Sequence, residues 1–227
     1  MTSNIPAVIF DFNGTLFSDT EFHNRAWQDF AERHKKTLTP YELECYVHGH
    51  ANREILDYLF KSEPKPEESA ILSEEKEEIY RNICLQNPEK CILSSGAEEY
   101  LNRLKRWNIA RTIATASYLK NLEMYFELFS LDRWFDMKNI IYDSGHFRGK
   151  PYPDMFLAAA EKIKVPIEQC MIVEDSLGGV QAAYHAGAAQ IIAFSNDDNP
   201  GKFSQFNFID QIVTDFRQID MVAVSLG

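Results

Sequence analysis

The sequence predicts an α/β protein in which a doubly wound parallel sheet is interrupted by an all-helical insert. From Gly96 onward, short apolar runs alternate with segments of helical period. Such alternation is typical of parallel strands joined by helices that cover both faces of a sheet. One more apolar run, residues 7–10, stands near the N-terminus, and only helical patterns lie between it and the alternating part. A chain of 227 residues can hold such a core and a smaller insert.

The first expected strand, residues 7–10, runs directly into Asp11, and Gly14 with Thr15 then breaks the apolar run. An acid at the carboxyl end of a buried parallel strand faces the crevice where open α/β sheets bind ligands. A carboxylate there can be a nucleophile, an oxygen ligand of Mg²⁺ or both. Taken alone, the pattern is more often a strand that enters a turn.

The expected insert, residues 18–92, contains helical patterns and no strand. Its second helix has a clear start, because Thr39-Pro40-Tyr41-Glu42 combines a capping box with proline at the first helical position. The remaining residues, 1–17 and 93–227, form the expected α/β core. The four helices of the insert are expected at about 21–35, from Thr39 onward, around 55–60 and near 73–86.

After the insert, helix and strand patterns follow each other to the end of the chain. Gly187 is expected to end one of these helices as its C-cap. In order, we expect a helix over 100–107, a strand over 110–116, a helix over 122–129, a strand over 139–142, a helix over 153–163, a strand over 170–173, a helix over 178–186, strands over 190–194 and 212–213, and a last helix from Phe216.

Composition excludes several classes of protein. Asp and Glu number 34 against 23 Lys and Arg, a net charge of −11 with no basic stripe, so nucleic acid and anionic membranes are not expected partners. No apolar run approaches the roughly 20 residues that span a bilayer. The N-terminus lacks the basic region of a signal peptide. We expect a cytoplasmic protein that is a monomer or a weak dimer.

The four cysteines lie far apart and form no C-x-x-C pair, which argues against a zinc knuckle or a dithiol redox motif. We expect reduced, mostly buried thiols, as in a cytosolic protein. They are Cys45, Cys84, Cys91 and Cys170.

Three further groups of polar residues follow expected strands. Thr115 and Ser117 follow the second strand, Lys150 lies in a loop before a helix, and Glu174 and Asp175 end the strand that begins at 170. Each group has an ordinary interpretation: helix N-caps for the hydroxyls and the acids, and a solvated surface charge for the lysine. Together with the first acid, they would bring a nucleophile, hydroxyl donors, a cation and two acids to one crevice. Phosphoryl transfer requires that combination.

In order and spacing, the four motifs resemble those of the haloacid dehalogenase superfamily. The helical insert is similar to the cap domain of its β-phosphoglucomutase and phosphoglycolate phosphatase-like branch. The resemblance covers essentially the whole chain and implies a Rossmann-like core that acts on a small phosphorylated metabolite. It implies that Asp11 accepts the phosphoryl group, that Thr115 and Ser117 hold that group, and that Lys150 offsets the charge of both.

The resemblance also implies a Mg²⁺ cofactor. Its ligands would be Asp11, the main-chain carbonyl of Asn13 and Asp175, with Glu174 in a direct or water-mediated role. The peptide bond between Lys150 and Pro151 resembles one that is often cis in this branch. X-Pro is the only kind of peptide bond for which the cis form costs little free energy relative to trans.

Three residues of the insert resemble substrate-binding positions of the cap. His23 and Trp27 match the first cap helix of β-phosphoglucomutase-like enzymes, although a partly buried structural histidine is almost as good an interpretation of His23. Arg53, after His48-Gly49-His50-Ala51-Asn52, resembles the cap loop that reads the substrate. Its spacing from Gly49 is one residue longer than in phosphoglucomutases, which counts against a sugar-phosphate mutase.

One position departs from the family pattern. The usual second acid, two residues after the nucleophile, is Asn13 here. That acid protonates the leaving oxygen and then deprotonates the attacking water, and an amide can do neither. If one general acid/base contributes ~10²–10⁴-fold, its loss raises the barrier by ~3–5 kcal/mol.

Three functions remain open at this point. The first, which we prefer, is a Mg²⁺-dependent phosphohydrolase for a metabolite with a good leaving group, such as an acyl or aryl phosphate, or one that uses His23 as a surrogate acid. The second is a β-phosphoglucomutase-like isomerase, which Asn13 disfavours more because both half-reactions need proton transfer. The third is a non-catalytic protein that binds a phosphometabolite. The sequence does not indicate the physiological substrate.

Overall fold

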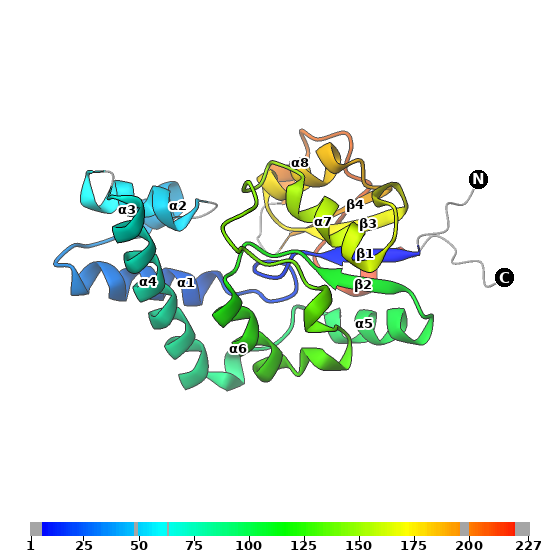
Figure 1. Cartoon of the computed structure of the whole chain (residues 1–227), viewed down its shortest axis with the longest axis horizontal. Helices are drawn as coiled ribbons and strands as arrows, with labels where there is room; N and C mark the ends of the chain where they lie inside the picture. Colours follow the sequence, from blue (N-terminus) through cyan, green and yellow to red (C-terminus); the bar gives the residue numbers. More distant parts are fainter. Residues whose placement is uncertain (1–5, 48–49, 63, 196–199, 221–227) are drawn as a thin grey trace. The chain divides into compact units, whose positions relative to one another are not determined.

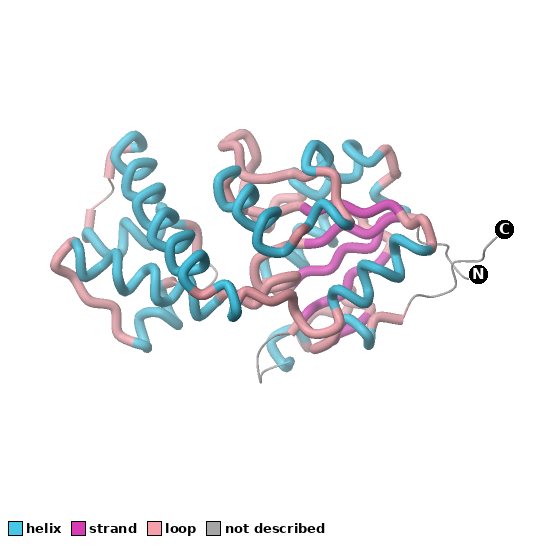
Figure 2. The backbone as a smooth tube through the Cα atoms, turned by 90° about the horizontal axis from the view of Figure 1, so that it is seen from below, coloured by secondary structure: helices cyan, strands magenta, loops and turns pink. Residues whose placement is uncertain are grey.

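In the computed structural model, the residues described are 6–47, 50–62, 64–195 and 200–220. They divide into two compact units, one from residues 1–18 and 92–227 and the other from residues 19–91. The first is an α/β unit, and the second contains helices and loops over its described residues (Figures 1 and 2). None of the helices in the described ranges is both long and apolar enough to cross a membrane.

A five-stranded sheet forms the centre of the first unit, with strand order β2-β1-β3-β4-β5 and parallel pairing throughout. This confirms the predicted fold class. The order places β1 between β2 and β3, so Phe10 pairs with Ile113 on one side and with Val173 on the other. The carboxyl ends of these three strands therefore lie side by side. The strands are β1 (Ala7–Phe10), β2 (Ala110–Ile113), β3 (Cys170–Glu174), β4 (Gln190–Phe194) and β5 (Gln211–Val213).

Helices cover both faces of this sheet (Figure 1). Side chains alternate along a strand, so Ile9 packs in one core cluster with Phe156 of α7 and Val180 of α8. Phe10 points to the other face, where its ring meets that of Tyr100 in α5 at 6.1 Å between centroids. The helices of this unit are α5 (Ala97–Arg106), α6 (Leu119–Phe129), α7 (Asp154–Ile163) and α8 (Leu177–Ala186), the last closed by Gly187 in the left-handed conformation.

Two expected elements of this unit are wrong. In place of a strand over 139–142 there is a short 3-10 helix, Met137–Asn139, followed by a single parallel bridge between Ile141 and Ala114. The Asp136 side chain accepts a hydrogen bond from the backbone N–H of Lys138 and starts that turn, so only one residue remains to pair. The last helix is likewise a 3-10 turn, Phe216–Gln218, and its continuation beyond residue 220 lies outside the described residues.

The second unit contains α1 (Thr20–Arg33), α2 (Pro40–Tyr46), α3 (Asn52–Phe60) and α4 (Pro66–Gln86). The capping box is confirmed, because the Thr39 hydroxyl accepts from the backbone of Glu42 while the Glu42 carboxylate accepts from the backbone of Thr39. Helix α4 begins at Pro66, a turn or more before the expected start near 73, since proline fits the first helical position. Along the described chain the cysteines are free thiols, and all but Cys45 are buried, as expected.

Candidate functional site

Asp11 and Lys150 meet at the carboxyl edge of the sheet. Asp11 directly follows β1, and its backbone N–H donates to the carbonyl of Val173 in β3. The Nζ of Lys150 lies 2.6 Å from Oδ1 of Asp11 and also donates to Oε1 of Glu174. The peptide bond between Lys150 and Pro151 is cis, as the resemblance implies. Residues separated by more than a hundred positions in the chain thus form one charged cluster.

Three carboxylates gather around this lysine. Oxygen atoms of Asp11, Glu174 and Asp175 all lie within 4.8 Å of one another. Asp11 and Glu174 are buried, with 5% and 1% of their surface exposed. Thr15 donates its hydroxyl hydrogen to Oδ1 of Asp175 at 2.9 Å, which orients the third carboxylate.

The charges of the cluster do not balance, because three carboxylates share one ammonium group. Burial opposes ionisation of Lys150, but the charges of Asp11 and Glu174 outweigh that effect and raise the pKa of the lysine. Burial, and then the charges of Glu174 and Asp11, raise the pKa of Asp175 well above its usual value. The three carboxylates repel one another, and an additional cation would reduce that repulsion.

The acidic cluster could hold a metal ion, and its chemistry fits Mg²⁺. Carboxylate oxygens are the hard donors that Mg²⁺ prefers, and this ion is commonly bound by one or two carboxylates with water and substrate phosphate completing its shell. Asp11, Glu174 and Asp175 supply such oxygens. The role of the Asn13 main-chain carbonyl as a further ligand stays a prediction.

Two glycines leave room for these carboxylates. Gly14 has φ +82°, and a Cβ built on it would lie 2.1 Å from Oδ2 of Asp175. A Cβ on Gly179, in the first turn of α8, would lie 1.9 Å from Oε1 of Glu174. The neighbouring Gly178 has space, since the nearest atom to its Cβ would be 3.7 Å away.

Gly179→Ala is therefore expected to displace the Glu174 carboxylate and weaken Mg²⁺ binding by about 10–100-fold, the usual cost of disturbing groups around a metal. Gly178→Ala is the matched control, because it makes the same change one residue earlier without a steric clash. Calorimetric titration with Mg²⁺ measures both variants. Equal affinities in the two variants would show that Glu174 does not contribute to the metal site.

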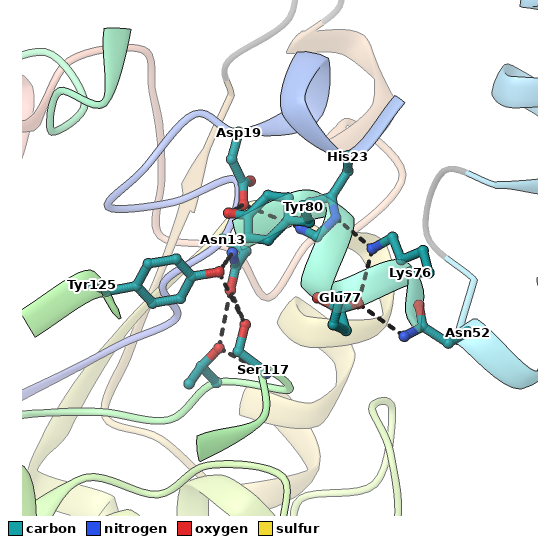
Figure 3. Close-up of polar contacts among 10 residues, drawn as sticks. Asn13, Asp19, His23, Asn52, Lys76, Glu77, Tyr80, Ser117 and Tyr125 are labelled. Atoms are coloured by element: carbon teal, nitrogen blue, oxygen red, sulfur yellow. Dashed lines mark hydrogen bonds and ion pairs between the residues drawn. The ribbon is translucent and has the colours of Figure 1, made fainter. Parts of the chain in front are cut away.

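Asn13 lies at the centre of a second cluster (Figure 3). Its Oδ1 accepts hydrogen bonds from Ser117 Oγ at 2.6 Å and from Thr115 Oγ1 at 3.2 Å. Its Nδ2 donates to the hydroxyl oxygen of Tyr125 at 2.8 Å. Thr115 Oγ1 also accepts the backbone N–H of Ser117, at 3.1 Å. The structure thus brings the predicted site residues Asn13, Thr115 and Ser117 together.

Tyr125 is a member of this cluster that sequence reasoning missed. It lies in α6, where it is fully buried and its ring stacks on that of Phe12 at 4.4 Å between centroids. A buried tyrosine hydroxyl usually needs a hydrogen-bonding partner. A tyrosine on the buried face of a helix was therefore the one sequence signal that could have pointed to a polar contact here. Its partner here is the amide of Asn13.

His23, in the second unit, belongs to a chain of polar groups (Figure 3). Its Nδ1 lies 2.7 Å from the Nζ of Lys76, which can only donate, so Nδ1 accepts. Its Nε2 lies 3.2 Å from Oδ2 of Asp19, and the same carboxylate oxygen accepts the hydroxyl of Tyr80 at 2.7 Å. The ring of His23 stacks on that of Tyr80 with centroids 4.0 Å apart.

Lys76 and Glu77 continue this chain inside α4. Both are buried, with 1% and 4% of their surface exposed, and the Lys76 Nζ donates to Oε1 of Glu77 at 2.8 Å. Asn52 donates to the same oxygen at 2.9 Å. Burial alone would raise the pKa of Glu77, but the charges of Lys76 and His23 and the hydrogen bonds from Lys76 and Asn52 together outweigh burial and lower that pKa to about 2. Burial lowers the pKa of Lys76.

The Glu77 carboxylate should make the protein's stability depend on pH. Its folded pKa of about 2 lies below the ordinary value of 4.5, so its stabilisation is complete above the ordinary value and is lost as the pH falls toward 2. A shift of this size corresponds to about 3 kcal/mol. Glu77→Gln should be less stable than wild type at neutral pH, and the difference should shrink on acidification. Urea unfolding at several pH values measures this. Glu78→Gln, on the exposed face of the same helix, should show no such trend; an equal trend would contradict the assignment.

The other two predicted substrate-binding residues lie in different environments. Trp27 is 2% exposed and packs edge-to-face against Phe30, with the Nζ of Lys76 5.1 Å from its ring centroid. Its place in the core favours a packing role. Arg53 is exposed in the first turn of α3. His48 and Gly49, whose spacing from Arg53 was used above, lie outside the described residues. Substrate contact by Trp27 and Arg53 stays a prediction.

The chain matches a family of known proteins over most of its length. The model of the haloacid dehalogenase-like hydrolase family matches residues 5–187. The chain is 27% identical over 200 residues to a phosphorylated carbohydrates phosphatase of Thermotoga maritima, a match that covers 86% of this chain and 88% of that protein.

Solved structures show the same fold. A crystal structure of a family IA, variant 3 hydrolase from Entamoeba histolytica superposes with a TM-score of 0.90 at 32% identity and covers 95% of this chain and 97% of the other. The β-phosphoglucomutase of Clostridium difficile superposes with a TM-score of 0.75 at 23% identity, covering 95% and 93% of the two chains, which shows the shared fold. The family match, over most of the chain, and the carboxylate and lysine cluster lead to one conclusion: this chain belongs to the haloacid dehalogenase-like hydrolases.

Proposed function

We propose that this protein is a Mg²⁺-dependent phosphatase of a small phosphorylated metabolite, with Asp11 as the residue that accepts the phosphoryl group. One observation carries the proposal: Asp11 is buried at the strand end with a lysine on one oxygen and two further carboxylates within 4.8 Å. An acid held this way can act as a nucleophile while cationic partners offset the charge of an incoming phosphate.

Each proposed site residue of the first unit has a separate role in the reaction. The Asp11 carboxylate attacks phosphorus, and the bond from phosphorus to the leaving oxygen breaks, which leaves an acyl phosphate. Lys150 offsets the charge of the carboxylate and the phosphoryl group, while Thr115 and Ser117 donate hydrogen bonds to phosphoryl oxygens. Mg²⁺ would be held by Asp11, Asn13 through its carbonyl, Glu174 and Asp175, and once bound it would stabilise the developing charge. Water then attacks phosphorus and its proton passes to solvent. The bond from phosphorus to the Asp11 oxygen breaks, which releases inorganic phosphate and regenerates the carboxylate.

Asn13 restricts the substrates that such a site can use efficiently. An alkoxide leaving group needs a proton from a general acid, and an amide cannot supply one. Acyl and aryl phosphates have leaving groups that depart without it. The Thermotoga maritima relative is named for phosphorylated carbohydrates, so we include phosphorylated sugars among the candidate metabolites. Residues 18–92 are proposed to act as a cap in which His23 and Arg53 face the substrate, while Trp27 packs in the interior of the cap. The free cysteines suit the reducing cytoplasm.

Two other functions are less well supported. A β-phosphoglucomutase-like isomerase shares the fold, but it must protonate and deprotonate sugar hydroxyls in both half-reactions, and Asn13 can do neither. A non-catalytic binder of a phosphometabolite would retain the crevice and need no acid. Binding a phosphate does not require a buried carboxylate, because carboxylates repel that anion. Asp11, held by Lys150 beside Glu174, therefore favours a catalytic role.

The proposal is tested with a panel of phosphorylated metabolites and aryl phosphates, assayed with Mg²⁺ and again with EDTA. We expect release of inorganic phosphate that is fastest with aryl or acyl phosphates and is lost with EDTA. Equal rates with and without EDTA would contradict a metal-dependent phosphatase. Interconversion of hexose phosphates in the presence of a bisphosphate activator would instead identify the isomerase.

A further inference from the structure

The contact between Tyr125 and Asn13 connects a buried phenol to the proposed phosphate site. The Asn13 side chain is held at both ends: Nδ2 donates to the Tyr125 hydroxyl at 2.8 Å, and Oδ1 accepts from Thr115 and Ser117 (Figure 3). Tyr125 is itself held in place, because its ring stacks on Phe12 with an interplanar angle of 23°. The orientation of the amide is therefore set from the side of α6.

This orientation puts Asn13 in competition with a phosphate ion. A serine or threonine hydroxyl has a single hydrogen to donate. Thr115 and Ser117 direct theirs to the amide oxygen of Asn13 at 3.2 and 2.6 Å. Phosphate oxygens without hydrogens can only accept, so a phosphate bound by these hydroxyls must take the same two hydrogens. One hydrogen cannot be donated fully to both acceptors.

We propose that Tyr125 is a positioning residue that holds Asn13 as a built-in competitor of phosphate and so promotes release of inorganic phosphate, the product of the proposed reaction. The inference rests on the proposed function, since it takes Thr115 and Ser117 to be phosphate ligands. Without the phenol oxygen, the amide loses the hydrogen bond from its Nδ2 to Tyr125 and turns away from the hydroxyls more readily, which leaves their hydrogens more available to phosphate.

The test measures the affinity for inorganic phosphate by calorimetry, with Mg²⁺ present, in a double-mutant cycle. Tyr125→Phe retains the stacked ring and removes only the hydroxyl. It is expected to bind phosphate about fivefold more tightly than wild type, the size of one neutral hydrogen bond. Asn13→Ala removes the competitor and should also tighten binding. Adding Tyr125→Phe to Asn13→Ala should change nothing further, because no amide is left to hold.

Two controls separate this role from a structural one. Tyr100→Phe removes the hydroxyl of another fully packed tyrosine, whose oxygen lies 3.5 Å from the sulfur of Met171, and should leave phosphate affinity unchanged. The side-chain amide signal of Asn13 in ¹⁵N NMR spectra should lose its protection from hydrogen exchange in Tyr125→Phe and keep it in Tyr100→Phe.

The outcomes are distinct. Weaker or unchanged phosphate binding in Tyr125→Phe, or the same effect of this change with and without Asn13, would overturn the positioning role. Ser117→Ala should weaken phosphate binding both in wild type and in Tyr125→Phe. If it does not, or if wild type and all variants fail to bind phosphate, the proposed function itself fails, and this inference fails with it.

Discussion

Asn13→Asp is expected to accelerate the hydrolysis of alkyl phosphates by about 10²–10⁴-fold, the contribution of one general acid/base. The substitution is nearly isosteric, and the new carboxylate would occupy a place already surrounded by hydroxyl groups. Thr115, Ser117 and Tyr125 lie 2.6–3.2 Å from the present amide atoms and can each donate to an acid there. In the first step, transfer of the phosphoryl group to Asp11, the gain should be smaller for aryl phosphates, whose leaving groups need less protonation. Single-turnover rates of leaving-group release from matched alkyl and aryl phosphates measure the difference.

The control for this prediction makes the same chemical change away from the site. Asn102→Asp, on α5, keeps an acceptor for the indole N–H of Trp134, which the present oxygen accepts at 2.8 Å, and should not alter turnover. Wild-type protein must also be checked by peptide mapping, because asparagine before the unhindered Gly14 can lose its amide and become aspartate on storage. Equal turnover in wild type and Asn13→Asp would show that the missing acid does not limit this protein, whereas no turnover in either form with any substrate would favour binding alone.

The sequence was sufficient to predict the sheet and the residues at its edge. Parallel strands present their carboxyl ends at one edge, so the acids and hydroxyls that follow β1, β2 and β3 had to converge there. The structure brings Asp11 and Lys150 to 2.6 Å although they are 139 positions apart. The prediction failed for 139–142 because buried Ile140 and half-buried Ile141 have the composition of a strand, whereas the 3-10 turn before them leaves a single residue to pair.

The partners of the site residues could not be predicted from local patterns. Helical period places Tyr125 on a buried face, but which atom its hydroxyl meets depends on a residue 112 positions away. Lys76 and Glu77 lie in an acidic segment and have the composition of a solvated helix face. They are buried because each pairs with the other and with a further polar group, His23 or Asn52, and such pairing depends on three helices packing together.

Wild-type protein given an aryl phosphate is expected to accumulate a phosphoryl group on Asp11. The first step needs little acid when the leaving group is good, so the carboxylate can attack at once. The second step always requires that water lose a proton as it attacks, and Asn13 cannot accept it. Loss of that base slows the second step alone by about 10²–10⁴-fold. Rapid mixing should therefore show a burst of phenol equal to the amount of enzyme, followed by slow turnover.

Two variants define this intermediate. Asp11→Asn should give neither burst nor turnover, since an amide is a poor nucleophile, and intact mass measurement should find the phosphoryl adduct in wild type but not in this variant. Asn13→Asp should lose the burst, because with its base restored the second step no longer limits turnover. A burst that survives in Asp11→Asn would place the nucleophile elsewhere, for example on Asp175 or a serine. A wild-type protein that turns over without any burst would mean that another group activates the water, and His23 of the second unit is the first residue to replace in that case.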